Sequence, residues 1–340
     1  MKKRGFIASV IFLIVFLAFY LLRDKPTAAS GIYQRDEGTV FGTLYHISYE
    51  YDKNIHQDIK NELQRFDNSL STFNKQSVIS RINQNDTTVE ADEWFTHVFL
   101  KGREVSDATE GSFDMTVAPL VNAWGFGFKK SDSVTPEMID SIRQFVGYDK
   151  VQLKGKKLIK SDTRIMLDAS AIAKGYACDV IGQLLSSKGI KNFMVEIGGE
   201  VTAKGKNASG KCWRIGINKP IEDASASSGE IQDIVNICDG GMATSGNYRN
   251  FYYKEGKRYA HTIDPRTGYP VQHTLLSATV IGPDCMTADA FATAFMVMGL
   301  EKSMEVVRQN PEIEAYFIYA AGESENAVAM SDGFKEYLKK

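Results

Sequence analysis

Residues 164–200, RIMLDASAIAKGYACDVIGQLLSSKGIKNFMVEIGGE, contain the alternation of segment types that decides the fold class. Residues 164–167 have the apolar character of a short buried strand. Apolar residues spaced three or four apart then predict a helix over residues 172–188, which a glycine ends. Residues 193–197 are a second predicted strand, and two glycines follow it. A strand, a helix and a strand in so short a stretch predict a mixed fold of α and β elements.

The same alternation continues on both sides of this stretch. Strands are predicted over residues 39–51, 213–217, 275–281 and 316–320, and helices over residues 55–70, 94–108 and 287–298. A short Ser-rich stretch, residues 223–229, predicts a surface loop. Because helices and strands are interleaved without a long linker or a repeat, we expect an α+β fold. We expect it to form one compact domain over residues 31–340, with a substantial antiparallel sheet.

The composition is that of a globular protein. Of the 340 residues, 43% are hydrophobic and 24% are charged, and the formal net charge is −2. Because there is no overall positive charge, we expect no nucleic-acid partner. Four cysteines are too few for a disulfide-built scaffold, and their spacing fits neither CxxC nor a zinc site. Cys178 and Cys285 fall in helical patterns and are predicted to pack as small apolar side chains.

The N-terminus has the pattern of a targeting segment. Lys2, Lys3 and Arg4 precede residues 6–22, FIASVIFLIVFLAFYLL, which carry no charge. Cations before an apolar run predict that the N-terminus stays in the cytoplasm and that the rest is exported. Residues 1–30 are therefore interpreted as a cleaved signal peptide or a retained hydrophobic membrane anchor. Both alternatives stay open, and a buried core helix is the less favoured interpretation.

The first candidate site begins at the helix over residues 172–188. Asp168 comes at the end of a predicted strand, and Lys174 lies in the first turns of the helix. Backbone N–H groups at a helix N-terminus favour an anion such as a ligand phosphate. The alternative is that Asp168 or Ser170 is an ordinary N-cap and that Lys174 is solvated.

The second candidate site lies on the predicted helix over residues 287–298. Asp289 and Thr293 are four residues apart and share one helix face, with Ala292 beside them. Carboxylate and hydroxyl oxygens, together with a nearby carbonyl, are ligands that Mg²⁺ prefers. The alternative is that Asp289 caps the helix and that Thr293 bonds back to it.

A histidine beside a turn is the third candidate. His261 precedes the turn sequence Asp264-Pro265-Arg266-Thr267-Gly268. A histidine near neutral pH is a suitable general base, although it could equally orient the turn. Two further small-residue turns, residues 198–200 and 243–247, would let a ligand approach the backbone. Aromatic residues beside glycines at 111–116 and 123–127 could hold a flat ring, or could be core.

Taken in order, these motifs resemble the ApbE family of FAD:protein FMN transferases. The resemblance covers residues 38 to 300. The matching features are Phe41-Gly42-Thr43, Ser71-Thr72-Phe73, Ser80-Arg81-Ile82-Asn83, residues 111–116, Trp124-Gly125-Phe126-Gly127, residues 168–175, Gly198-Gly199-Glu200, Thr244-Ser245-Gly246, residues 261–268 and residues 288–293.

The resemblance implies a T-fold-related domain and a reaction. Such enzymes transfer the FMN part of FAD, with Mg²⁺, to a Thr or Ser hydroxyl of a target protein and release AMP. The acceptor carries a Ser/Thr-Gly-Ala-Thr-like motif and is typically a subunit of a membrane redox complex. The resemblance also implies an exported enzyme, at the outer face of the bacterial inner membrane or in the periplasm.

The resemblance also assigns roles to residues of this sequence. It makes His261 the base and gives the metal to Asp289, Thr293 and the backbone carbonyl of Ala171. The FAD contacts that it implies are Phe41, Phe73, Ala123, Trp124, Gly125, Asp168, Lys174 and Ile263.

Three departures and two alternatives accompany the resemblance. The family often has Met at the position of Phe41, and several relatives have Gly at Ser170 or Ala171. Ser277-Ala278-Thr279 only partly matches the acceptor motif and falls in a predicted buried strand, so we expect no self-flavinylation. The alternatives are a hydrolase that splits FAD into FMN and AMP, and a flavin-binding protein without turnover.

Overall fold

The computed structural model describes residues 31–126, 134–221, 230–247, 251–254, 257–322 and 325–339. The predicted targeting segment over residues 1–30 and the predicted loop over residues 223–229 lie outside the described residues. None of the helices within the described ranges is both long and apolar enough for a membrane crossing.

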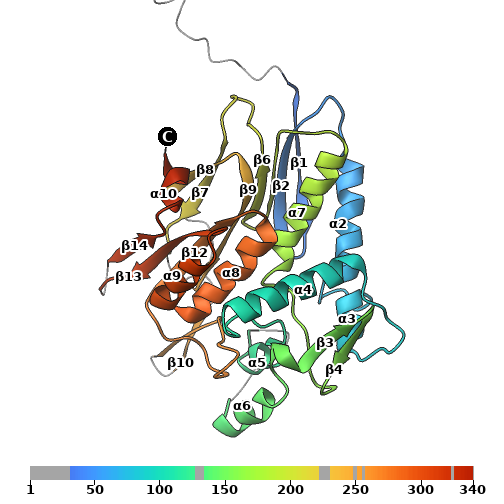
Figure 1. The fold of residues 1–340 in the computed structure, drawn as a ribbon, viewed down its shortest axis with the longest axis vertical. Coiled ribbons are helices and arrows are strands. Elements are labelled where there is room, and N and C mark those ends of the chain that lie inside the picture. Colours follow the sequence, from blue (N-terminus) through green and yellow to red (C-terminus); the bar gives the residue numbers. More distant parts are fainter. Residues whose placement is uncertain are drawn as a thin grey trace, which may run out of the picture.

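An eight-stranded antiparallel sheet forms the centre of the molecule (Figure 1). Its order is β1-β2-β5-β6-β9-β12-β13-β14, and every neighbouring pair is antiparallel. The strands are β1 (Tyr33–Val40), β2 (Thr43–Glu50), β5 (Phe193–Ile197), β6 (Glu200–Lys204), β9 (Asp239–Gly246), β12 (Leu275–Gly282), β13 (Glu314–Ala320) and β14 (Asn326–Met330). The expected mixed fold with a largely antiparallel sheet is therefore confirmed.

The segment over residues 39–51 is a hairpin and not the single strand that its alternation predicts. Val40 pairs with Thr43, so that Phe41 and Gly42 form a two-residue turn with φ of 53° and 75°. Positive φ at both central residues is what a tight hairpin turn requires. Period-2 alternation continues through so short a turn, and Phe-Gly is a weak turn signal, so the sequence pattern does not show the reversal.

Among the described residues, five helices lie on one face of the sheet (Figure 1). They are α2 (His56–Leu70), α4 (Glu93–Ala108), α7 (Ala173–Ser187), α8 (Cys285–Met298) and α9 (Leu300–Gln309). The helices α7 and α8 pack on the sheet and against each other. Gly175 of α7 allows this close approach, because a Cβ there would lie 2.3 Å from the carbonyl oxygen of Cys285. Cys178 and Cys285 are both fully buried, as predicted.

A buried carboxylate fixes the start of α8. Asp179 of α7 accepts hydrogen bonds from the backbone N–H groups of Cys285 (3.0 Å) and Met286 (2.8 Å) and from the hydroxyl of Thr202 (2.6 Å). The first N–H groups of a helix have no partner within the helix. Asp179 therefore connects α7, β6 and the N-terminus of α8.

The opposite face of the sheet carries a smaller layer. It consists of β7 (Trp213–Asn218), β8 (Ile231–Ile237) and α10 (Phe334–Leu338), packed over a second hydrophobic cluster. A disulfide joins Cys212, just before β7, to Cys238, just after β8. The two chain ends of this hairpin are therefore linked covalently beside the sheet.

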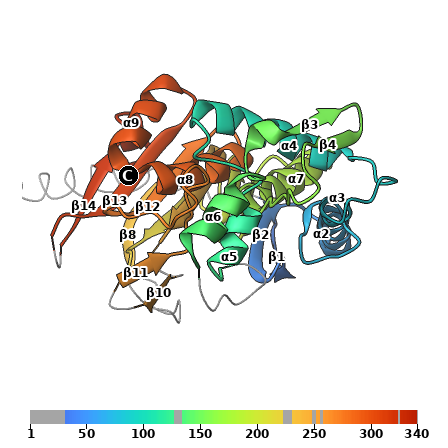
Figure 2. The same ribbon diagram turned by 90° about the horizontal axis from the view of Figure 1, so that it is seen from below.

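The smaller elements gather at one end of the molecule, seen face-on in Figure 2. They are α3 (Val78–Asn83), α5 (Ala118–Ala123), α6 (Pro136–Arg143), the 3₁₀ turn Tyr148–Lys150, β3 (Val151–Lys154), β4 (Lys157–Lys160), β10 (Phe251–Lys254) and β11 (Lys257–Ala260). A third hydrophobic cluster around Leu120, Trp124 and Ile139 holds α5 and α6 together.

Most predicted boundaries agree with the structure, but one predicted strand is wrong. The other predicted helices and strands begin and end within two residues of the observed ones, apart from the hairpin over residues 39–51. Residues 164–167 are irregular. The side chain of Asn83 donates to the carbonyl of Leu167 and accepts from its N–H, both at 2.8 Å. These two bonds replace those that a neighbouring strand would make, so the extended segment joins no sheet.

Candidate functional site

A cavity of about 580 Å³ lies between the start of α7, the inner face of α8 and the residues around α5. Its lining includes eight of the residues predicted from the sequence: Phe73, Asp168, Ala171, Lys174, His261, Ile263, Asp289 and Thr293. These residues come from widely separated parts of the chain. The fold therefore brings together side chains that the sequence shows only as separate motifs.

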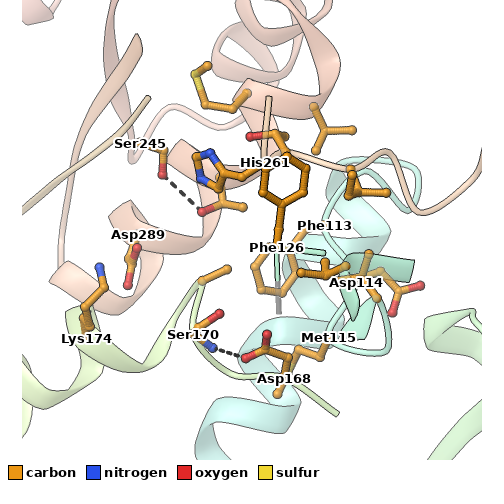
Figure 3. Close-up of a pocket in the computed structure, with 18 of the residues that line it drawn as sticks. Phe113, Asp114, Met115, Phe126, Asp168, Ser170, Lys174, Ser245, His261 and Asp289 are labelled. Atoms are coloured by element: carbon orange, nitrogen blue, oxygen red, sulfur yellow. Dashed lines mark hydrogen bonds between the residues drawn. The ribbon is translucent and has the colours of Figure 1, made fainter. Parts of the chain in front are cut away.

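One end of the cavity carries a cluster of charges (Figure 3). The ammonium group of Lys174 lies 2.6 Å from Glu200 Oε1, and one oxygen of Asp289 accepts from the backbone N–H of Gly175 at 3.0 Å. Glu200 and Asp289 are 4% and 2% exposed. Burial raises the pKa of Glu200 to about 7 and also raises the pKa of Asp289. Burial lowers the pKa of Lys174, but the two carboxylates outweigh it and the pKa is raised.

The oxygen atoms at this end suit a hard divalent cation. Asp289 and Thr293 lie on consecutive turns of α8, and both line the cavity with Ala171. The hydroxyl of Thr293 lies 3.1 Å from that of Ser245 on β9. Within the described ranges, no three His, Cys, Asp or Glu side chains group as a metal site. Mg²⁺ takes few protein ligands and keeps several waters, so one carboxylate, one hydroxyl and one carbonyl are compatible with it.

Asp168 holds the loop that leads into α7. Its carboxylate accepts from the backbone N–H of Ser170 at 2.8 Å (Figure 3), and its own N–H donates to the carbonyl of Met115 at 2.7 Å. The second bond ties this loop to the segment around Asp114. Burial raises the pKa of Asp114, whose carboxylate accepts from the N–H and the hydroxyl of Thr116.

His261 directly follows β11 and lies beside an aromatic ring. The imidazole and the ring of Phe126 are 6.4 Å apart between centroids, in an edge-to-face arrangement (Figure 3). The predicted turn follows His261: Gly268 N–H donates to the carbonyl of Asp264 at 2.8 Å, and the carboxylate of Asp264 pairs with Arg266 at 2.9 Å. These bonds hold the turn, and both His261 and Pro265 of the turn line the cavity.

The residues predicted to flank the flavin rings separate into those that line the cavity and those that do not. Phe73 lines the cavity and is 74% exposed. Phe41, Ala123, Trp124 and Gly125 are not among the lining residues. The indole N–H of Trp124 donates to the carbonyl of Gly268 at 2.8 Å, and Phe41 packs on Phe66 of α2 with centroids 5.4 Å apart. A flavin contact for these four residues stays a prediction.

Several lining residues were predicted only as members of a motif, with no individual role in the site. Glu200, Phe113 and Ser245 all line the cavity. Glu200 follows a glycine pair, and the alternation of its strand places it on the same face as Thr202, toward the helices. A charged residue on an inward strand position is the signal that could have singled it out.

Comparisons with a family model, with curated proteins and with solved structures identify the same family for this chain. The ApbE family model matches residues 41–317. A Haemophilus influenzae protein named FAD:protein FMN transferase is 40% identical over 80% of this chain and 83% of its own length. The flavin transferase ApbE from Vibrio cholerae matches with a TM-score of 0.81 and 36% identity, covering 91% of this chain and all of that one. The apo flavinyl transferase ApbE from Pseudomonas stutzeri matches with a TM-score of 0.81 and 30% identity, over 91% and 97% of the two chains. The chain therefore belongs to the ApbE family of enzymes.

Proposed function

We propose that this chain transfers the FMN part of FAD to a serine or threonine hydroxyl of a target protein, with Mg²⁺ as cofactor and AMP as the leaving group. One observation carries the proposal: a single cavity is lined by Lys174, His261 and Asp289, from three distant parts of the chain. The names of the relatives, FAD:protein FMN transferase, support the same activity.

In the proposed reaction the acceptor oxygen forms a bond to the phosphorus of the FMN half. The bond from this phosphorus to the bridging oxygen breaks, and AMP leaves with the electron pair. The hydroxyl proton passes to the imidazole of His261, which can accept a proton near neutral pH. Lys174 places a positive charge beside the phosphates, where negative charge would otherwise oppose attack.

The cation would be held by Asp289, Thr293 and the carbonyl of Ala171. When bound it would neutralise charge on the phosphoryl oxygens. Asp168 and the backbone of Ile263 would hold FAD, and the exposed ring of Phe73 would cover part of the flavin. Stacking on an aromatic ring is a favourable contact for a flat heterocycle.

The decisive experiment incubates the full chain with FAD, Mg²⁺ and a peptide that carries a Ser/Thr-Gly-Ala-Thr-like motif. The expected result is a peptide heavier by one FMN, with one AMP released for each peptide modified. AMP and free FMN without a heavier peptide would show a hydrolase instead. If FAD binds but no AMP appears, the chain is a flavin-binding protein.

Two variants test the assigned roles in this assay. Asp289→Asn is expected to lose about 10³-fold in rate, because it removes the only carboxylate assigned to the metal. Asp284→Asn is the matched control on the same helix: Asp284 caps α8 by accepting from Thr287 N–H at 2.7 Å, and Asn caps equally well. His261→Ala is expected to bind FAD and to lose about 10²- to 10⁴-fold in rate. Full activity of either variant would remove its residue from the role.

We further propose that the enzyme acts outside the cytoplasm on a subunit of a membrane redox complex. The apolar run over residues 6–22 and the disulfide between Cys212 and Cys238 support this location, because stable disulfides are typical of oxidising compartments. Alkylation of protein taken directly from cells should leave these two cysteines unmodified until a reductant is added. Immediate modification of both would contradict the location.

A further inference from the structure

The second oxygen of Glu200 is the most informative polar atom in the cavity wall. Glu200 begins β6, directly after Gly198 and Gly199, and is 4% exposed. Its Oε1 pairs with Lys174 at 2.6 Å. Its Oε2 is buried and has no hydrogen-bond partner within the part of the chain that the structure describes. A buried carboxylate oxygen without a partner is costly, so a glutamate kept at this position beside the cavity favours a functional reason for its charge.

A second glutamate in the same hairpin shows that this arrangement is specific. Glu196 of β5 lies four residues earlier and uses both of its oxygens. Oε1 accepts from the backbone N–H of Gly199 at 2.6 Å, and Oε2 pairs with His46 Nδ1 at 2.6 Å. The turn and the neighbouring strand β2 therefore satisfy this carboxylate completely, and the unpartnered oxygen of Glu200 does not result from a general shortage of donors.

The charges around Glu200 do not balance. Lys174 interacts with both Glu200 and Asp289, so one ammonium group faces two carboxyl groups. Both carboxyl groups are almost fully buried, where uncompensated charge is expensive. One further positive charge at this end of the cavity would compensate them.

We propose that Glu200 is a positioning residue for the divalent cation, in addition to holding Lys174. Its charge adds to that of Asp289 in attracting the cation, and the cation in turn would compensate the carboxyl group that Lys174 alone leaves unbalanced. The inference rests on the proposed function, because it concerns the same cavity and the same cation. It adds a residue that is neither a ligand to the metal nor in contact with the reacting atoms.

The test measures binding of Mn²⁺ alone to the full chain, by electron paramagnetic resonance, without FAD or acceptor. Glu200→Gln is expected to weaken Mn²⁺ binding by about tenfold or more, since it removes a charge close to a doubly charged ion. Lys174→Met breaks the same ion pair but removes a positive charge, so it is expected to strengthen binding. Glu196→Gln is the matched control and is expected to leave binding unchanged.

The opposite effects that Glu200→Gln and Lys174→Met should have on Mn²⁺ affinity separate an electrostatic role of Glu200 from a structural one. If Glu200→Gln and Lys174→Met weaken binding alike, the ion pair only supports the fold, and the inference is overturned. Unchanged binding in Glu200→Gln, or no Mn²⁺ binding by the unmodified chain, overturns it as well. Glu200→Asp, which keeps the charge, guards against a folding defect and should bind Mn²⁺ within about threefold of the unmodified chain.

The peptide assay keeps this inference separate from the proposed function. If the unmodified chain modifies the peptide while Glu200→Gln binds Mn²⁺ normally, the inference fails and the function stands. If no peptide is modified while the signs for Mn²⁺ are as expected, the function fails and the role of Glu200 stands.

Discussion

Replacing Asp179 by Asn tests how the start of α8 is held. The carboxylate accepts from two backbone N–H groups, of Cys285 and Met286, and from the hydroxyl of Thr202. An Asn side chain has the same shape, but its –NH₂ group cannot accept a bond. Whichever way the amide turns, it presents a donor to a backbone donor or leaves one without a partner.

The magnitude follows from the number of bonds lost. A hydrogen bond to a charged group contributes about 1.5–3 kcal/mol, and a buried donor left unpaired costs about 1–3 kcal/mol. Because Asp179 is only 8% exposed, water cannot replace the lost acceptor easily. The neutral side chain avoids the cost of burying a charge, which offsets part of the loss. A net destabilisation of about 3 kcal/mol, or a Tm lower by about 6 °C, is expected.

Thermal unfolding of the full chain, followed by circular dichroism, measures this effect. Thr202→Val removes only the hydroxyl bond and is expected to lower the Tm by about 2 °C. A Tm for Asp179→Asn within about 1 °C of the unmodified chain, or higher than that of Thr202→Val, would refute the role of Asp179 in holding the start of α8.

Three further predictions concern packing, the disulfide and the loop before α7. Gly175→Ala should destabilise the chain by about 2 kcal/mol or more in urea, although Ala is the better helix former, because its Cβ would meet the carbonyl of Cys285; a more stable variant would contradict this. Replacing Cys212 and Cys238 by Ala should lower the free energy of unfolding by about 3.5 kcal/mol. A reductant should lower the urea midpoint of the unmodified chain but not that of the variant; an equal effect on the two proteins would contradict this. Asn83→Ala should raise the KM for FAD about tenfold with little change in kcat, because the loop before α7 loses two bonds, and an unchanged KM would argue against that role.

The sequence predicted the regular elements well because their patterns are local. The apolar spacing in residues 172–188 is sufficient to predict α7, and the alternation in residues 193–197 to predict β5. The reversal at Phe41 escaped prediction because a two-residue turn barely interrupts the alternation. Residues 164–167 were predicted as a strand because their pattern does not depend on what they pair with, and Asn83 replaces the neighbouring strand.

The site was predicted less completely because its parts are distant in the sequence. The spacing of Asp289 and Thr293 on one helix predicts their common face, and both line the cavity. The pairing of Lys174 with Glu200 could not be predicted, since it depends on how α7 packs against β6. The bond from the indole N–H of Trp124 to the carbonyl of Gly268 could not be predicted either, because the two residues are distant in the sequence.

The residues that line the cavity are far apart in the sequence, and this determines when the cavity can form during synthesis of the chain. Its lining begins at Thr72 and ends at Val297, and the sheet behind it pairs β2 with β5 across more than a hundred residues. Such long-range pairings form slowly. A growing polypeptide therefore has no complete wall until residue 297 has been synthesised. Capture of a nucleotide by this cavity therefore requires that the chain has been synthesised at least as far as Val297.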